Sequence, residues 1–190
     1  MKSCDIYVIS WFGQHQNAIE IAEQLRGLPF KVTIIYSDPD SECQIKYERS
    51  IRRPNDLFWG DKFKACIDDS DSDLILVIHA DCVVDSWRKL ATRAVEVLSR
   101  NSQIGVWAPY IEWPSKPPRA TFINAIKPGP FIFSAWTDSL IFALRRPIVE
   151  RMKAAKYEEN IYGWGICYMF MACALSFGQL TIVDTSLKVI

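Results

Sequence analysis

The segment LILVIHADC (residues 74–82) places five aliphatic residues directly before a histidine, an alanine, a carboxylate and a thiol. An apolar run of this length is typical of a strand that is buried on both faces at the centre of a parallel sheet. Ligands of open α/β sheets bind at the carboxyl ends of such strands, so Asp81 is a candidate ligand-binding residue. A turn or helix-capping role for this carboxylate is the alternative interpretation.

The first half of the chain alternates strand-like and helix-like segments. Apolar runs predict further strands at 5–10, 31–36 and 104–111. Apolar residues at helical spacing predict helices at 17–27, 56–69 and 86–98. Asn17 is the expected N-cap of the first helix and Gly27 its stop, while Asp85 or Ser86 caps the third. This repeated β-α-β order predicts a parallel sheet with right-handed crossovers.

The second half begins with a proline-rich stretch. Residues 112–130 hold five prolines and no clean period, which favours a long surface excursion of the kind that often carries binding residues. The segment 131–146 predicts two strands, or a hairpin around 136–139, and a short helix follows from Pro147 through Ala155. A loop punctuated by glycines, a helix that ends near Gly178 and a last strand complete the prediction.

Composition narrows the class of protein. With 190 residues, 49% of them hydrophobic, the chain can bury one sizeable core, and we predict a single domain, 1–190. Lysine and arginine balance aspartate and glutamate at 22 each, which argues against wholesale binding of nucleic acid. Only the small basic group of Arg49, Arg52 and Arg53 is a candidate anion contact.

The cysteines and the apolar segments bear on the compartment. The six cysteines show no C-x-x-C spacing, and several lie in apolar segments where a reduced thiol packs like a small hydrophobe. The chain enters a strand-like run at once, without the pattern of a signal peptide. The longest apolar stretch, 166–177, is too short to span a bilayer. We therefore expect a reduced, cytoplasmic protein.

Four segments in this order are similar to the family 2-like nucleotide-sugar glycosyltransferases of the GT-A fold, and the resemblance covers nearly the whole chain. The segments are YSDPD, WGDKFKACIDDSDSDLILVIHADC, WTDSLIFALRR and EENIYGWGICYMF. The resemblance implies an α/β fold with a GT-A, Rossmann-like, mostly parallel central sheet flanked by helices. It also implies a nucleotide-binding half at about 1–110 and an acceptor-side half at about 111–190.

The family resemblance implies transfer of a sugar from a nucleoside-diphosphate sugar to a glycan or glycolipid acceptor. A divalent cation, Mn²⁺ or Mg²⁺, would neutralise the departing diphosphate, and these hard cations prefer carboxylate oxygens. The family ends its metal strand in D-x-D, where this chain has His79-Ala80-Asp81. Asp81 is therefore the expected metal ligand. His79 is expected to contact a ribose hydroxyl or the metal, with a structural histidine as the alternative.

Three further residues are expected near the nucleotide sugar. Asp38 in YSDPD would accept hydrogen bonds from the nucleobase or ribose, although aspartate and proline also favour a plain turn. Lys62 would approach the nucleotide, with a solvated lysine as the alternative. Trp164 in YGWG would stack on a sugar ring, or else pack in the core at a helix-entry turn.

The resemblance also implies candidates for the catalytic residues. Asp138 lies where the family contacts donor sugar and acceptor. The aspartate that the family places after its glycine motif is replaced by Ile166-Cys167, and a thiol is a poor substitute for a carboxylate base. Glu158 or Glu159 is therefore the candidate base. The alternatives are an enzyme that retains the donor stereochemistry and a protein impaired as a transferase.

The sequence is also compatible with two other functions. A silent GT-A-like module would bind a sugar nucleotide or a partner without turnover. A nucleotidyltransferase is disfavoured because no glycine-rich, lysine-containing phosphate loop lies near the N-terminus. The expected partners are a nucleotide sugar and a glycan or glycolipid acceptor, with association at a membrane surface but no transmembrane segment. The histidine that many relatives carry after the last strand has no counterpart in the final SLKVI, which suggests a compact or truncated catalytic domain.

Overall fold

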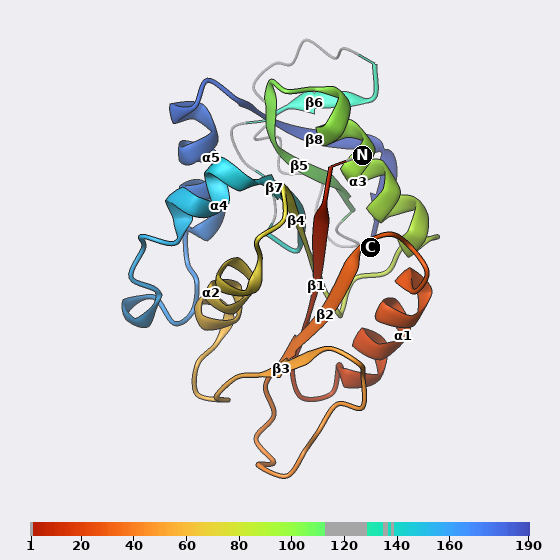
Figure 1. Ribbon diagram of the computed structural model, residues 1–190, viewed down its shortest axis with the longest axis vertical. Coiled ribbons are helices and arrows are strands. Elements are labelled where there is room, and N and C mark those ends of the chain that lie inside the picture. Colours follow the sequence, from red (N-terminus) through yellow and green to blue (C-terminus); the bar gives the residue numbers. More distant parts are fainter. Residues whose placement is uncertain (1, 113–128, 135–136, 138) are drawn as a thin grey trace.

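The computed structural model describes residues 2–112, 129–134, 137 and 139–190, which form one sheet covered by helices on both faces (Figure 1). The strands are β1 (Cys4–Ser10), β2 (Lys31–Tyr36), β3 (Ser50–Arg52), β4 (Leu74–His79), β5 (Ile104–Ile111), β6 (Phe131–Phe133), β7 (Ile141–Arg145) and β8 (Leu180–Val189). The helices are α1 (His15–Leu25), α2 (Trp59–Asp69), α3 (Trp87–Arg100), α4 (Arg146–Met152), the short 3₁₀-helix η1 (Tyr157–Glu159) and α5 (Ile166–Ser176). The fold class is α/β, as predicted.

The sheet has the strand order β3-β2-β1-β4-β7-β5-β8-β6. The strands β3, β2, β1 and β4 run parallel, so their carboxyl ends meet at one edge. β4 lies between β1 and β7, and its aliphatic residues 74–78 are fully buried. The prediction of a central buried strand from LILVIH is confirmed.

The second half of the sheet departs from the predicted parallel order. β7 runs antiparallel to both β4 and β5, while β5 and β8 pair in parallel. β6 and β7 do not form the hairpin offered as one interpretation of 131–146, because β6 pairs with β8 instead. Burial explains the separation: all five residues of β7 are buried, which suits an interior strand, whereas only Ile132 is buried in β6 at the sheet edge.

The helices divide between the two faces of the sheet. α1 and α3 cover one face, and α2, α4 and α5 cover the other (Figure 1). Ser86 caps α3 as predicted, since its hydroxyl accepts a hydrogen bond from the amide of Lys89 at 3.3 Å. No helix among the described residues is long and apolar enough to cross a membrane.

Two helix boundaries differ from the sequence prediction, and one short strand was missed. α1 begins at His15, with Gln14 rather than Asn17 at the N-cap, and the Asn17 side chain donates to the Gln14 side chain at 2.8 Å. α4 ends at Met152, short of the predicted Ala155. The strand β3 was not predicted, because three residues are too few to show an apolar period.

Candidate functional site

A cavity of about 510 Å³ opens at the carboxyl ends of the parallel strands. Ile9 of β1, Ser37 after β2 and His79 of β4 contribute to its wall. The remaining lining residues come from the segments after β1 and β2 and from the region of α2, together with one residue of the loop before α5: Trp11, Phe12, Pro39, Asn55, Phe58, Trp59, Lys62 and Tyr162. Five of these are aromatic, so the cavity suits a flat, partly apolar ligand.

The loop before α5 reaches this cavity through close packing against α2. The amide of Gly60 donates to the carbonyl of Ile161 at 2.9 Å, and the rings of Phe58 and Tyr162 stack with centroids 4.8 Å apart. Gly163 has φ +69°, and a Cβ there would lie 2.2 Å from the Trp59 ring. Glycine at this position thus allows the loop to lie directly on Trp59.

Two buried polar atoms of the cavity residues have no hydrogen-bond partner among the described residues, His79 Nε2 and Trp59 Nε1. The two rings meet edge to face, with centroids 4.6 Å apart. Burial, together with the positive charge of Lys62, lowers the pKa of His79 to about 4, so the imidazole is neutral near pH 7. Because buried polar atoms normally have partners, these two atoms are candidate contacts for a ligand.

Lys62 is buried, which rules out the solvated lysine considered as an alternative. Its ammonium group donates to the carbonyl oxygens of Leu57 at 3.2 Å and Phe58 at 3.3 Å. Burial lowers the pKa of Lys62 from its ordinary value. An ammonium group has three N–H donors, and these two carbonyls accept two of the hydrogen bonds. Lys62 itself lines the cavity.

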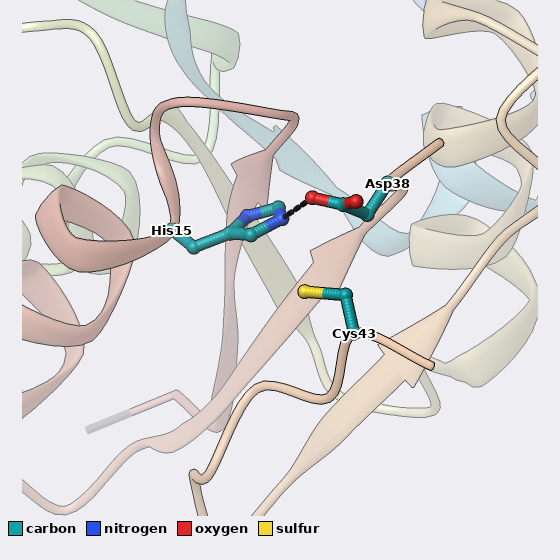
Figure 2. Close-up of side chains that lie close together, drawn as sticks. All are labelled: His15, Asp38 and Cys43. Carbon is teal, nitrogen blue, oxygen red and sulfur yellow. Dashed lines mark hydrogen bonds and ion pairs between the residues drawn. The ribbon is translucent and has the colours of Figure 1, made fainter. Parts of the chain in front are cut away.

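Asp38 follows β2 and is only 6% exposed. One carboxylate oxygen lies 2.8 Å from His15 Nε2 (Figure 2). The other accepts the amide of Asp40 at 2.8 Å. Burial alone would raise the pKa of Asp38, but these hydrogen bonds and the nearby imidazole hold it below its ordinary value. The bond to Asp40 agrees with the turn interpretation, whereas the contact with His15 is long-range and was not predicted.

Asp81 lies two residues beyond the end of β4 and is exposed. It does not cap α3, because Ser86 does, so the helix-capping interpretation is wrong. Asp81 is not among the residues that line the cavity, although His79, two residues before it, is. Its exposed carboxylate has the hard oxygen atoms that divalent cations prefer.

Of the predicted site residues that the structure describes, only Lys62 and His79 line the cavity. Trp164 is 82% exposed, so the core interpretation of this side chain is wrong, and Tyr162 of the same loop lines the cavity instead. Glu158 and Glu159 are exposed on η1, where Glu159 pairs with Lys156 at 3.2 Å. Asp138 lies outside the described residues.

The basic group considered as an anion contact is engaged within the fold. Arg53 forms a bidentate pair with Asp61, with N–O distances of 2.6 and 2.7 Å. Arg52 donates to backbone carbonyls of the loop between β2 and β3. A guanidinium nitrogen of Arg49 lies 3.8 Å from a carboxylate oxygen of Asp69. These guanidinium groups therefore serve the structure of the β2–β3 region.

Sequence reasoning missed most of the aromatic lining. Trp11 and Phe12 directly follow β1, and Phe58 directly precedes α2. The pair WF directly after the first predicted strand could have indicated this lining. Ligands of α/β sheets bind at the carboxyl ends of strands, and that rule applies to WF as it does to Asp81. Tyr162 was within the glycine-containing loop, but nothing local distinguishes it from Trp164.

The fold is the Rossmann-like GT-A fold, as comparison with solved structures shows. GalNAc-T7 with UDP, GalNAc and Mn²⁺ matches with a TM-score of 0.66 and 10% identity, over 100% of this chain and 43% of that one. The mannosyltransferase PcManGT from Pyrobaculum calidifontis in complex with GDP-Man and Mn²⁺ matches with a TM-score of 0.66 and 11% identity, over 99% and 56%. This chain thus spans about half the length of these two transferases.

A third similar structure belongs to a different enzyme class. CMP:2-keto-3-deoxy-manno-octonic acid synthetase complexed with CTP matches with a TM-score of 0.57 and 12% identity, over 96% of this chain and 88% of that one. No protein-family model and no curated protein sequence matches the chain. The finer assignment to family 2 stays a prediction.

Proposed function

We propose that this chain is a glycosyltransferase domain that binds a nucleoside-diphosphate sugar in the aromatic cavity and transfers the sugar to a glycan or glycolipid acceptor. The observation that carries the proposal is the cavity at the carboxyl ends of β1, β2 and β4, where two buried polar atoms have no partner among the described residues. The similarity in fold to transferases solved with UDP or GDP-Man and Mn²⁺ supports it.

The cavity has the groups that a nucleoside requires. A base can stack on its aromatic rings, a contact worth about 1–3 kcal/mol in other proteins. Trp59 Nε1 can donate a hydrogen bond, and neutral His79 can donate or accept one at Nε2. The buried ammonium of Lys62 favours an anionic ligand. Asp38 does not itself line the cavity, but it lies between Ser37 and Pro39, which do. Its carboxylate could accept a further bond from the base or ribose, because a carboxylate has about four acceptor sites.

We assign the divalent cation to Asp81. Its exposed carboxylate fits Mn²⁺ or Mg²⁺, which prefer oxygen ligands and retain water and phosphate ligands. A cation bound there would neutralise charge on the departing diphosphate. His79 is assigned to the nucleotide rather than to the metal, because its ring lies against Trp59 and Trp11 in the cavity wall.

Nucleotide binding is the first test. We expect one of UDP, GDP, dTDP and CMP to raise the melting temperature in the presence of Mn²⁺, since a ligand at a hundred times its Kd adds about 2.7 kcal/mol of stability. Asp81→Ala should abolish the part of this shift that depends on Mn²⁺. Asp85→Ala, another exposed carboxylate of the same segment, is the matched control and should retain it. Absence of a shift with all four nucleotides would contradict the proposal.

The catalytic base is assigned to Glu159, and Asp138 and Trp164 to contacts with the donor sugar and acceptor. Glu159→Gln keeps the size of the side chain but removes its basicity, so we expect kcat to fall at least about 100-fold with an unchanged nucleotide Kd. Glu158→Gln is the matched control from the same short helix. Turnover of Glu159→Gln at the wild-type rate would eliminate this base, and loss in Glu158→Gln alone would transfer the role to Glu158.

A nucleotidyltransferase is the second candidate, favoured by the match to the CTP-bound synthetase over 88% of that chain. Product analysis separates the functions because the bonds broken differ. A glycosyltransferase releases nucleoside diphosphate, whereas a nucleotidyltransferase releases pyrophosphate. A silent binding module releases neither product while it still shows the nucleotide-dependent melting shift.

A further inference from the structure

Three side chains from separate segments converge beside the carboxyl ends of β1 and β2, apart from the residues that line the cavity. They are His15 at the start of α1, Asp38 after β2 and Cys43 in the loop before β3 (Figure 2). One nitrogen, one carboxylate oxygen and the sulfur all lie within 4.8 Å of one another. Three ligand atoms this close need only small shifts to surround one metal ion.

The imidazole of His15 is already oriented as metal-bound histidines are. Its Nδ1 lies 2.7 Å from the hydroxyl of buried Ser10, and its Nε2 faces Asp38 at 2.8 Å. Metal-ligating histidines use the second ring nitrogen for such a hydrogen bond, which fixes the ring. In the structure the Asp38 carboxylate can only accept, so Nε2–H donates to it and Nδ1 accepts from the Ser10 hydroxyl. When a metal takes Nε2, the proton can move to Nδ1, and the Ser10 hydroxyl can then accept a hydrogen bond from it. The ring of Tyr36 packs edge-on against the same imidazole, with centroids 5.6 Å apart.

The loop that carries the other two ligands is held in place by one guanidinium group. Arg52 donates to the carbonyl oxygens of Asp38 at 3.3 Å, Asp40 at 2.6 Å and Cys43 at 2.9 Å, and also to that of Ser41. The amide of Cys43 donates to the Asp40 carbonyl at 3.2 Å. The backbone is thus fixed at both ligand positions, and little chain entropy remains to be lost when a metal binds.

We propose that His15, Asp38 and Cys43 form a zinc site with three protein ligands and a fourth position for water or another ligand. Imidazole, thiolate and carboxylate together suit Zn²⁺, whereas Mn²⁺ and Mg²⁺ favour all-oxygen sites. This site is therefore distinct in chemistry from the cation assigned to Asp81. Binding would displace the thiol proton of Cys43 and replace the contact between Nε2 and the carboxylate.

The site has a consequence for the cavity. Ser37 and Pro39, which flank Asp38, both line it. A metal on Asp38 would thus fix the β2–β3 loop against the start of α1 and hold one wall of the cavity. It would also occupy the Asp38 carboxylate, so the nucleobase would depend more on Trp59 and His79.

Metal titration of the full chain without nucleotide tests the site independently of the proposed transferase function. We expect one equivalent of Zn²⁺ to compete with a chromophoric chelator, and Co²⁺ to give thiolate-to-metal charge-transfer absorption in the near ultraviolet. Cys43→Ala should abolish that absorption and weaken Zn²⁺ binding at least about 100-fold, since loss of even an outer partner costs 10–100-fold. His15→Ala should weaken Zn²⁺ binding by a similar factor.

Cys173→Ala is the matched control, because Cys173 is also a partly buried free cysteine but lies on α5. It should bind both metals as the wild type does. The proposal is overturned if the wild type does not bind Zn²⁺, or if Cys43→Ala keeps the charge-transfer band. It is also overturned if Cys173→Ala loses the band. Cys43→Ser provides a second variant of nearly unchanged size, which separates loss of the ligand from loss of the fold.

Discussion

Replacement of Asp184 by alanine is expected to lower the free energy of unfolding by about 3–5 kcal/mol. Asp184 of β8 is fully buried, and one of its oxygens accepts from Arg93 Nε at 2.8 Å and from Trp107 Nε1 at 3.2 Å. Its other oxygen accepts the amide and hydroxyl of Ser186 at 3.1 and 2.6 Å. Alanine would leave these donors without their acceptor, and the measurement is urea unfolding followed by tryptophan fluorescence.

Asp184→Asn is the informative comparison for this prediction. It preserves size and one acceptor oxygen but removes the charge opposite Arg93, so we expect a cost of about 1.5–3 kcal/mol. Asp71→Ala, at an exposed carboxylate, should change stability by less than about 0.5 kcal/mol. An alanine variant at 184 as stable as the wild type would show that this buried network does not hold α3, β5 and β8 together.

Replacement of Gly163 by alanine is expected to cost about 2–4 kcal/mol and to weaken nucleotide binding. The residue has φ +69°, and its new Cβ would lie 2.2 Å from the Trp59 ring and 3.0 Å from the Ile166 side chain. The clash can be relieved only if the loop or Trp59 moves. Since Trp59 forms part of the cavity wall, the shape of the cavity would change as well.

Gly165→Ala separates the backbone strain from the clash. Gly165 has a similar φ of +79°, but a Cβ there meets nothing within 4 Å. We expect the free energy of unfolding of this variant to fall by only about 1 kcal/mol, the cost of the left-handed conformation for alanine. Nucleotide binding should be unchanged. If the two variants have equal stability in thermal unfolding, the close packing of Gly163 on Trp59 does not contribute to stability.

Much of the fold could be predicted from local patterns. The aliphatic run of β4, the apolar spacing of α3 and the cap at Ser86 each depend on residues close together in the chain, so they appear directly in the sequence. The position of β7 could not be predicted this way. A buried run of five residues is compatible with any interior place in the sheet, and the pairing with β4 and β5 joins segments far apart in sequence.

The candidate site, too, could be predicted from the sequence only in part. Strand-end position made Asp81 a candidate, because the end of an apolar run is visible without a structure. Asp38 became a candidate only through the resemblance of YSDPD to the GT-A glycosyltransferases. The burial of Lys62 was not visible in the sequence, since lysines are usually exposed and its partners are backbone carbonyls rather than side chains. Tyr162 enters the cavity while Trp164 faces solvent, which depends on how the loop lies on α2.

The sequence by itself determined the α/β class, the parallel order of the first strands and the sheet edge at which the cavity opens. Apolar periodicity determines which side of an element is buried, and it carries that information within a few residues. Only the tertiary structure decided which buried sides meet. The reversal of β7, the aromatic wall around His79 and the convergence of His15, Asp38 and Cys43 all arise from contacts between distant segments, where local pattern contains no information about the partner.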